Sequence, residues 1–128
     1  MRKPTSEIIA VILVLITTIG VVGATLAYRA KTKPEIELLA RSPEKGNWSP
    51  RTITVERGKG VTIRIRNEDA VTHGFYLPAF DIAVREIKAG TVEKVKFIPN
   101  SAGEYTFFCN VWCSDYHMQM RGKLIVKE

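Results

Sequence analysis

A run of twenty-one residues without a charge, Ile8 to Tyr28, constrains this 128-residue chain more than any other feature. At about 1.5 Å per residue, a helix of that length spans a hydrocarbon core of roughly 30 Å. A cleaved signal peptide is the alternative, since Arg2 and Lys3 form a basic start and Ala24 to Ala27 supplies small residues near the end of the run. Because the apolar part of a signal peptide is usually only about 7–15 residues long, the sequence favours a retained transmembrane helix.

This helix divides the chain into four expected parts. They are an N-terminal tail (1–7), a transmembrane helix (8–28), a short polar linker (29–33) and one globular domain (34–128). Basic residues stand on both sides of the helix, so the positive-inside rule does not choose its orientation.

The residues after the helix are basic, with 17 Lys+Arg and 12 Asp+Glu in 29–128. The charges are scattered, and no recognition helix or aromatic–basic interleaving accompanies them. The sequence therefore predicts no nucleic-acid partner. Contact of Arg29, Lys31 and Lys33 with anionic lipid headgroups stays open.

The globular part has the pattern of a β-protein. In 61–66 the residues Val61, Ile63 and Ile65 alternate with polar ones, which is typical of a strand with one face on a core. Short segments of this kind, separated by turn residues and without a convincing amphipathic helix, predict an antiparallel sandwich or barrel. The expected strands are Glu35–Ala40, Thr52–Arg57, Val61–Arg66, His73–Leu77, Ile82–Ile87, Val92–Ile98, Glu104–Cys109 and Lys123–Lys127.

The loop before the last strand, CNVWCSDYHMQM, holds both cysteines and one of the two histidines of the chain. Its spacing is Cys109-x3-Cys113-x3-His117-x2-Met120. Thiolates, imidazole and thioether together are a donor set for copper, since zinc rarely binds methionine and magnesium or calcium prefers oxygen. His73, the other histidine, is the candidate for a further ligand.

The residues alone leave two other interpretations open. A mononuclear blue-copper site would use His73, Cys113, His117 and Met120, and would leave Cys109 spare. A structural disulfide between the two cysteines would make no use of the histidines or the methionine. By strand alternation Met118 is expected to face away from Met120 and to pack, while Trp48 and Trp112 are expected in the core or at its rim.

Four stretches of the sequence resemble the dinuclear-copper (CuA) domain of subunit II of haem-copper oxidases and of nitrous oxide reductases. They are VTHGFYLP, the Gly-Thr-Val stretch after REIKA, SAGEYTFFC and CNVWCSDYHMQMRGKLIVKE. The resemblance covers about residues 50–128. It implies an all-β fold, a cupredoxin-like Greek-key β-sandwich, which agrees with the strands read from the pattern.

The resemblance also implies a ligand set for two copper ions. Cys109 and Cys113 would bridge both ions through their thiolates. His73 and Met120 would complete one copper, and His117 with the backbone carbonyl of Val111 would complete the other. An electron shared between two bridged metals in a rigid frame changes each bond little, which favours fast transfer.

The match departs from the family at two positions. The oxidase pattern commonly has glutamate where this chain has Val111 and glycine where it has Ser114. Without this carboxylate, the presence of a further metal at the junction with a catalytic subunit stays open. The sequences THGF and HMQM are closer to those of nitrous oxide reductase. A single helix followed by the copper domain, however, resembles the short subunit II of B-type oxidases.

The resemblance therefore implies an electron-transfer subunit of the respiratory chain that is not catalytic alone. It would accept electrons from cytochrome c or a blue-copper protein outside the cell membrane and pass them to the haem-bearing catalytic subunit of a cytochrome c oxidase. The alternatives are a stand-alone anchored CuA protein serving another reductase, a copper-delivery protein, and a metal-free, disulfide-bonded adaptor.

Overall fold

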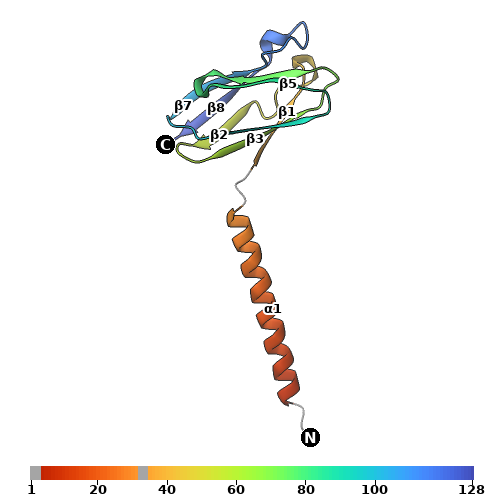
Figure 1. Cartoon of the computed structure of the whole chain (residues 1–128), viewed down its shortest axis with the longest axis vertical. Coiled ribbons are helices and arrows are strands. Elements are labelled where there is room, and N and C mark those ends of the chain that lie inside the picture. Colours follow the sequence, from red (N-terminus) through yellow and green to blue (C-terminus); the bar gives the residue numbers. More distant parts are fainter. Residues whose placement is uncertain (1–3, 32–34) are drawn as a thin grey trace. The chain divides into compact units, whose positions relative to one another are not determined.

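The computed structural model describes residues 4–31 and 35–128 (Figure 1). The chain divides into two compact units, Met1–Lys33 and Pro34–Glu128, the first containing one helix and the second eight strands. The predicted tail and linker fall partly outside this description, because residues 1–3 and 32–34 are not part of it.

Helix α1 runs from Pro4 to Lys31, and its segment Thr5–Tyr28 is long and apolar enough to cross a membrane. It is longer than the predicted 8–28, and it includes 29–31 of the predicted linker. The hydroxyls of Thr17, Thr18 and Thr25 donate hydrogen bonds to helix carbonyls three or four residues earlier. These side chains therefore bring no unpaired hydroxyl into an apolar environment.

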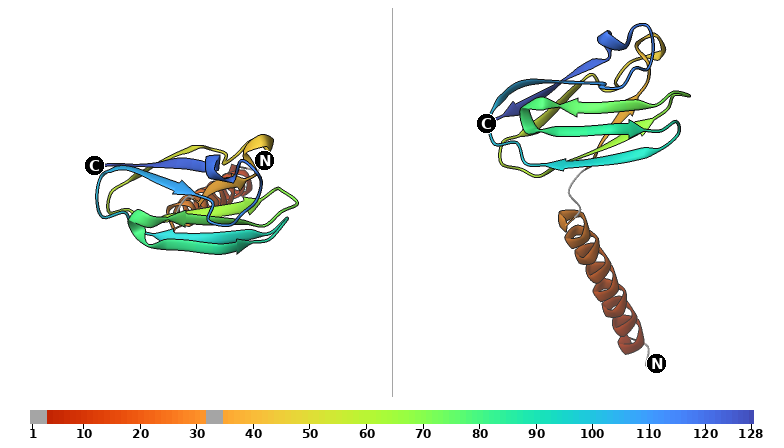
Figure 2. Two further views of the ribbon diagram at one scale, coloured as in Figure 1. Left: turned by 90° about the horizontal axis from the view of Figure 1, so that it is seen from above. Right: turned by 45° about the horizontal axis from the view of Figure 1, so that its top comes forward.

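The second unit is a sandwich of two sheets (Figures 1 and 2). One sheet has the order β1-β3-β6 and the other β2-β8-β7-β4-β5. The strands are β1 (Glu35–Ala40), β2 (Thr52–Glu56), β3 (Val61–Asn67), β4 (His73–Leu77), β5 (Ile82–Ile87), β6 (Val92–Phe97), β7 (Gly103–Phe108) and β8 (Arg121–Lys127).

The predicted alternation in β3 is confirmed, since Val61, Ile63 and Ile65 are all buried. They face the other sheet, where strand residues such as Phe107 and Leu124 are buried in the same core. An aromatic group stands at the centre, with the Trp48 ring 5.8 Å from that of Phe75 and 5.7 Å from that of Phe107. Trp48 is thus a core residue, as the sequence predicted.

The prediction of an antiparallel sandwich is wrong for two strand pairs. β1 runs parallel to β3, with Leu38 opposite Ile65, and β2 runs parallel to β8, with Val55 opposite Val126. Side-chain alternation determines which face of a strand is buried, but it is the same for parallel and antiparallel neighbours. The remaining pairs, β3–β6, β4–β5, β4–β7 and β7–β8, are antiparallel.

Candidate metal centre

The cysteine-rich loop, residues 109–120, connects β7 to β8 at one end of the sandwich (Figures 1 and 2). Its last part forms the short 3-10 helix η3, His117–Gln119. The backbone N–H of Cys109 donates to the carbonyl of Met120 at 3.1 Å, which joins the two ends of the loop. The loop is therefore held at both ends by paired strands.

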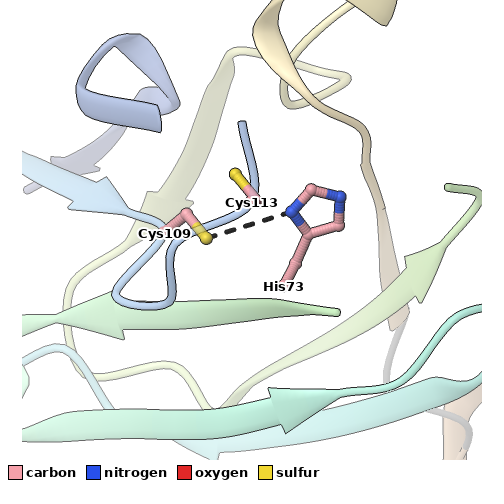
Figure 3. Close-up of side chains that lie close together, drawn as sticks. All are labelled: His73, Cys109 and Cys113. Carbon is pink, nitrogen blue, oxygen red and sulfur yellow. Dashed lines mark hydrogen bonds between the residues drawn. The ribbon is translucent and has the colours of Figure 1, made fainter. Parts of the chain in front are cut away.

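His73, at the start of β4, lies beside this loop (Figure 3). One ligand atom from each of His73, Cys109 and Cys113 lies within 4.8 Å of the other two. All three residues are buried. Residues separated by 36 positions in the sequence thus form one compact group of a nitrogen and two sulfurs.

Cys109 contacts two potential donors. Its Sγ is 3.9 Å from Nδ1 of His73 and 3.1 Å from the carbonyl oxygen of Val111. It also accepts a hydrogen bond of 3.3 Å from the backbone N–H of Gly74. A hydrogen bond of this kind orients a sulfur that could bind a metal.

Cys113 contacts two further potential donors, His117 and Met120. Its Sγ lies 3.5 Å from Nδ1 of His117 and 3.7 Å from Sδ of Met120. Burial, together with neighbouring Cys109, raises the pKa of the Cys113 thiol to about 12. A metal binding here must therefore displace a proton.

The two cysteines are free thiols and are not bonded to each other. The structure thus brings together all six predicted residues: His73, Cys109, Val111, Cys113, His117 and Met120. Two thiols, two imidazoles, a thioether and a carbonyl fit copper, because this metal accepts soft sulfur with borderline nitrogen.

Asp69 also contacts the candidate site, and the sequence pattern did not single it out. Its Oδ2 lies 3.4 Å from Nε2 of His73 and accepts hydrogen bonds from the backbone N–H and the hydroxyl of Ser42. Its Oδ1 accepts a hydrogen bond from Lys45 Nζ. Burial raises the pKa of the Asp69 carboxyl, but the hydrogen bonds from Lys45 and Ser42 outweigh burial and hold the pKa well below its usual range.

An ionised Asp69 selects the tautomer of His73. A carboxylate at Nε2 accepts a hydrogen bond from the N–H of that nitrogen, and in this tautomer the lone pair of Nδ1 is directed at the cysteines. Burial lowers the pKa of His73 despite the opposing effect of Asp69, which keeps the imidazole neutral and able to bind a metal. The available signal was the position of Asp69 four residues before His73.

The segment 42–48, between β1 and β2, holds the loop from the side (Figure 1). Asn47 Nδ2 donates to the carbonyl of Gln119 at 2.9 Å, and Trp48 Nε1 donates to the carbonyl of Met120 at 3.3 Å. The same segment contains Ser42 and Lys45, which bind Asp69. This segment, 42–48, which we call the strap, therefore supports both the loop and, through Asp69, His73.

Two expectations about the loop surface need correction. Met118 does not pack by strand alternation: it lies in η3, outside any strand, and is 66% exposed. Trp112 is 70% exposed, and its ring lies 5.7 Å from that of His117. Both side chains are on the solvent side of the loop, next to a proposed ligand.

A hollow of about 430 Å³ opens beside the loop. Cys109, His117 and Met118 line it from the loop, and Thr106, Phe108 and Arg121 line it from the sheet. It gives solvent and partner molecules an approach to this side of the site.

The fold and the donor set define a β-sandwich metalloprotein with a sulfur-rich site at one end. The chain belongs to the cupredoxin-like domain family, whose profile matches residues 8–126. Membership of this family supports copper as the metal.

Among curated proteins, the chain is similar to cytochrome c oxidase subunit 2 of Thermus thermophilus, with 33% identity over 63% of this chain and 58% of that protein. It is also similar to nitrous-oxide reductase of Ralstonia nicotianae, with 30% identity over 74% of this chain but only 15% of that protein. The chain thus spans about half the length of the first relative and a small part of the second.

Two solved structures have the same fold. The periplasmic domain of subunit II of the cytochrome oxidase of Bradyrhizobium japonicum matches with a TM-score of 0.64 at 19% identity, over 77% of this chain and 86% of that domain. A chain of a heme-copper terminal oxidase dimer matches with a TM-score of 0.62 at 24% identity, over 96% of this chain and 97% of that one.

Proposed function

We propose that this protein is the membrane-anchored electron-accepting subunit of a haem-copper terminal oxidase, with two copper ions in the site described above. The proposed ligands are His73 and Met120 for one copper, His117 and the Val111 carbonyl for the other, and the sulfurs of Cys109 and Cys113 as bridges.

One observation carries the proposal of two coppers. Each sulfur contacts one ligand of each ion: Cys109 contacts His73 and the Val111 carbonyl, and Cys113 contacts Met120 and His117. A bridging thiolate requires this arrangement. A mononuclear blue-copper site would leave Cys109 without a role, although it lies between two donors.

When bound, a thiolate-bridged copper pair takes up and releases one electron shared between the two metals. The protein contributes a frame that changes little during this transfer. Asp69 fixes the His73 ring, Gly74 donates to the Cys109 sulfur, and Trp48 holds the carbonyl of Met120. These contacts come from β4, from the segment that joins β3 to β4 and from the segment 42–48, and supports of this kind keep preorganised sites in their geometry.

The partners follow from the relatives. An oxidase subunit of this kind receives electrons from cytochrome c or a blue-copper protein and passes them to a haem-bearing catalytic subunit. The copper domain then lies on the periplasmic or extracellular side of the cell membrane, anchored by α1. The similarity to nitrous-oxide reductase supports a second candidate, a stand-alone anchored electron-transfer protein that serves another reductase.

Electron paramagnetic resonance of the full chain in detergent, loaded with copper, tests the site. We expect two coppers per chain and a seven-line hyperfine pattern, since the unpaired electron is shared by two equivalent nuclei. A four-line spectrum with one copper would replace the proposal with a blue-copper site. Co-purification with a haem-bearing subunit separates the oxidase from the stand-alone candidate.

Val111 offers a further check on the ligand set. Its proposed contribution is the backbone carbonyl, so Val111→Ala is expected to retain two coppers and the seven-line pattern. Loss of one copper in this variant would show that the side chain, and not the carbonyl, is required.

A further inference from the structure

A second hollow, of about 370 Å³, lies on the outer face of the five-stranded sheet. We call it the basic groove, because three of its lining residues are cationic. It is lined by Arg51, Thr52, Thr106, Arg121, Gly122 and Lys123.

The charge of the groove is only partly compensated. Lys123 pairs with Glu104 at 3.1 Å, and both side chains are 61% exposed. Arg121 Nε donates to the carbonyl of Met118 at 2.8 Å, which fixes the side chain without neutralising it. Such surface pairing is weak, so the groove retains a positive potential toward solvent.

The groove is continuous with the hollow beside the cysteine-rich loop. Thr106 and Arg121 line both. Strand pairing places Phe108 opposite Arg121 and Thr106 opposite Lys123 across β7 and β8. A partner seated in the groove would thus also cover the hollow that His117 and Met118 line.

The loop side of this surface carries three exposed large apolar side chains, next to the exposed carboxylate of Asp115. Trp112 and Met118 are 70% and 66% exposed, and Tyr116 is 54% exposed. An apolar centre with a charged margin is the usual anatomy of a protein–protein interface. Exposed apolar side chains that stand close together on a surface often mark a site of protein–protein interaction.

We propose that the basic groove and the exposed loop residues form one docking surface for an electron donor whose interacting face is acidic. This inference rests on the proposed electron-transfer function. In the docked complex the reduced donor loses one electron and the oxidised copper centre gains it, with no bond or proton transferred. Trp112 and His117, with ring centroids 5.7 Å apart, would connect such a donor to the proposed ligand set.

Charge complementarity selects an acidic partner rather than a basic one. Opposite charges raise association rates by about 10- to 1,000-fold at low ionic strength, and salt removes most of this gain. The globular unit, residues 34–128, carries 14 Lys+Arg against 12 Asp+Glu, so its net charge is small and the preference has to come from the groove itself.

The test is stopped-flow oxidation of two reduced c-type cytochromes, one strongly acidic and one strongly basic, by the copper-loaded full chain in uncharged detergent. At low salt we expect the acidic cytochrome to react at least about tenfold faster, with the difference lost at high salt. Arg51→Glu should slow the acidic cytochrome several-fold at low salt.

Lys96→Glu is the matched control. It makes the same change in net charge, but Lys96 is exposed on β6, in the opposite sheet. We expect less than a twofold effect. If both variants slowed the acidic cytochrome equally, the preference for it would come from the overall charge of the protein and the groove would not be the docking surface. A faster reaction with the basic cytochrome would also overturn the proposal.

Two further arms separate the alternatives. Hydroquinone, which is small and neutral, should reduce the copper centre at the same rate in all variants. A variant that hydroquinone fails to reduce would have a damaged copper centre, which is a different defect from a lost docking surface. Inorganic phosphate at constant ionic strength should not inhibit the acidic cytochrome. Strong inhibition that Arg51→Glu abolishes would identify the groove as a small-anion site instead.

Discussion

Asp69 Oδ2 lies 3.4 Å from Nε2 of His73, and the Asp69 and His73 side chains are only 2% and 0% exposed. The other oxygen of the same carboxylate is 2.6 Å from Lys45 Nζ, which is 55% exposed. A surface lysine and a buried proposed ligand are thus connected through one carboxylate. The ring of His73 is thus contacted by a group that is outside the proposed ligand set.

Asp69→Asn is therefore expected to weaken copper binding. The amide can place an N–H toward His73 and no longer favours the tautomer with a free Nδ1. Loss of a hydrogen-bond partner of a metal ligand typically costs roughly 10- to 100-fold in affinity. Competition with a copper chelator of known affinity, on the full chain, measures the change.

Asp115→Asn serves as the control, because Asp115 lies in the same loop and is exposed. Its affinity should stay within about twofold of the original chain. An Asp69→Asn protein with unchanged affinity would show that the strap and β4 position His73 without the carboxylate.

Gly74→Ala is expected to disturb the loop. A Cβ on Gly74 would overlap Oδ1 of Asn110 and lie 3.0 Å from both a Val111 methyl and the Val84 carbonyl. Val111 supplies a proposed ligand through its backbone, so the expected result is an altered hyperfine pattern with weaker copper binding. The double variant Gly74→Ala/Asn110→Ala removes the most severe overlap and should recover part of the affinity; no recovery would place the strain at the Val84 backbone.

Met120→Leu separates packing from ligation. Met120 is fully buried, and leucine conserves most of its volume, so the change should cost less than about 1.5 kcal/mol in unfolding free energy. Loss of the weak thioether ligand should nevertheless shift the reduction potential while two coppers remain. Met118→Leu, at an exposed position two residues earlier, should leave the potential unchanged. A potential that is the same in all three proteins would remove Met120 from the ligand set.

Trp48→Phe tests the strap. The variant loses the hydrogen bond from Nε1 to the Met120 carbonyl and part of the contact with Phe75 and Phe107. Together these losses should lower the free energy of unfolding of the metal-free protein by about 1–3 kcal/mol. Urea unfolding in detergent gives the value. Trp112→Phe, on the exposed side of the loop, should change stability by less than about 0.5 kcal/mol.

Much of the fold could be predicted from local patterns. Each of the eight strands was placed within two residues of its observed ends, because alternating Val, Ile and Phe residues mark a buried face and glycine or proline marks the turns. The parallel pairing of β1 with β3 could not be predicted, since it depends on how distant segments meet. Met118 was misplaced because a strand period was applied to a 3-10 turn.

The residues of the candidate site could be predicted to lie together, but the residues that support them could not. Cys109, Cys113, His117 and Met120 stand in one short motif, so their chemistry can be read directly. Trp48 and Asn47 lie 72 residues from the carbonyls that they bind. No local pattern connects residues at that separation. Nothing in the sequence around this tryptophan and asparagine indicates that they hold the cysteine-rich loop.

The cysteine-rich loop is held by hydrogen bonds to its backbone, and these bonds do not involve its exposed side chains. The backbone carbonyls of Gln119 and Met120 accept the hydrogen bonds that join the two ends of the loop and attach it to the segment 42–48. The side chains of Trp112, Tyr116 and Met118 are exposed and make none of these bonds. The side chains of Tyr116 and Met118 can therefore vary without removing the hydrogen bonds that hold the proposed metal site. A change of electron donor would then require substitutions in the proposed docking surface alone.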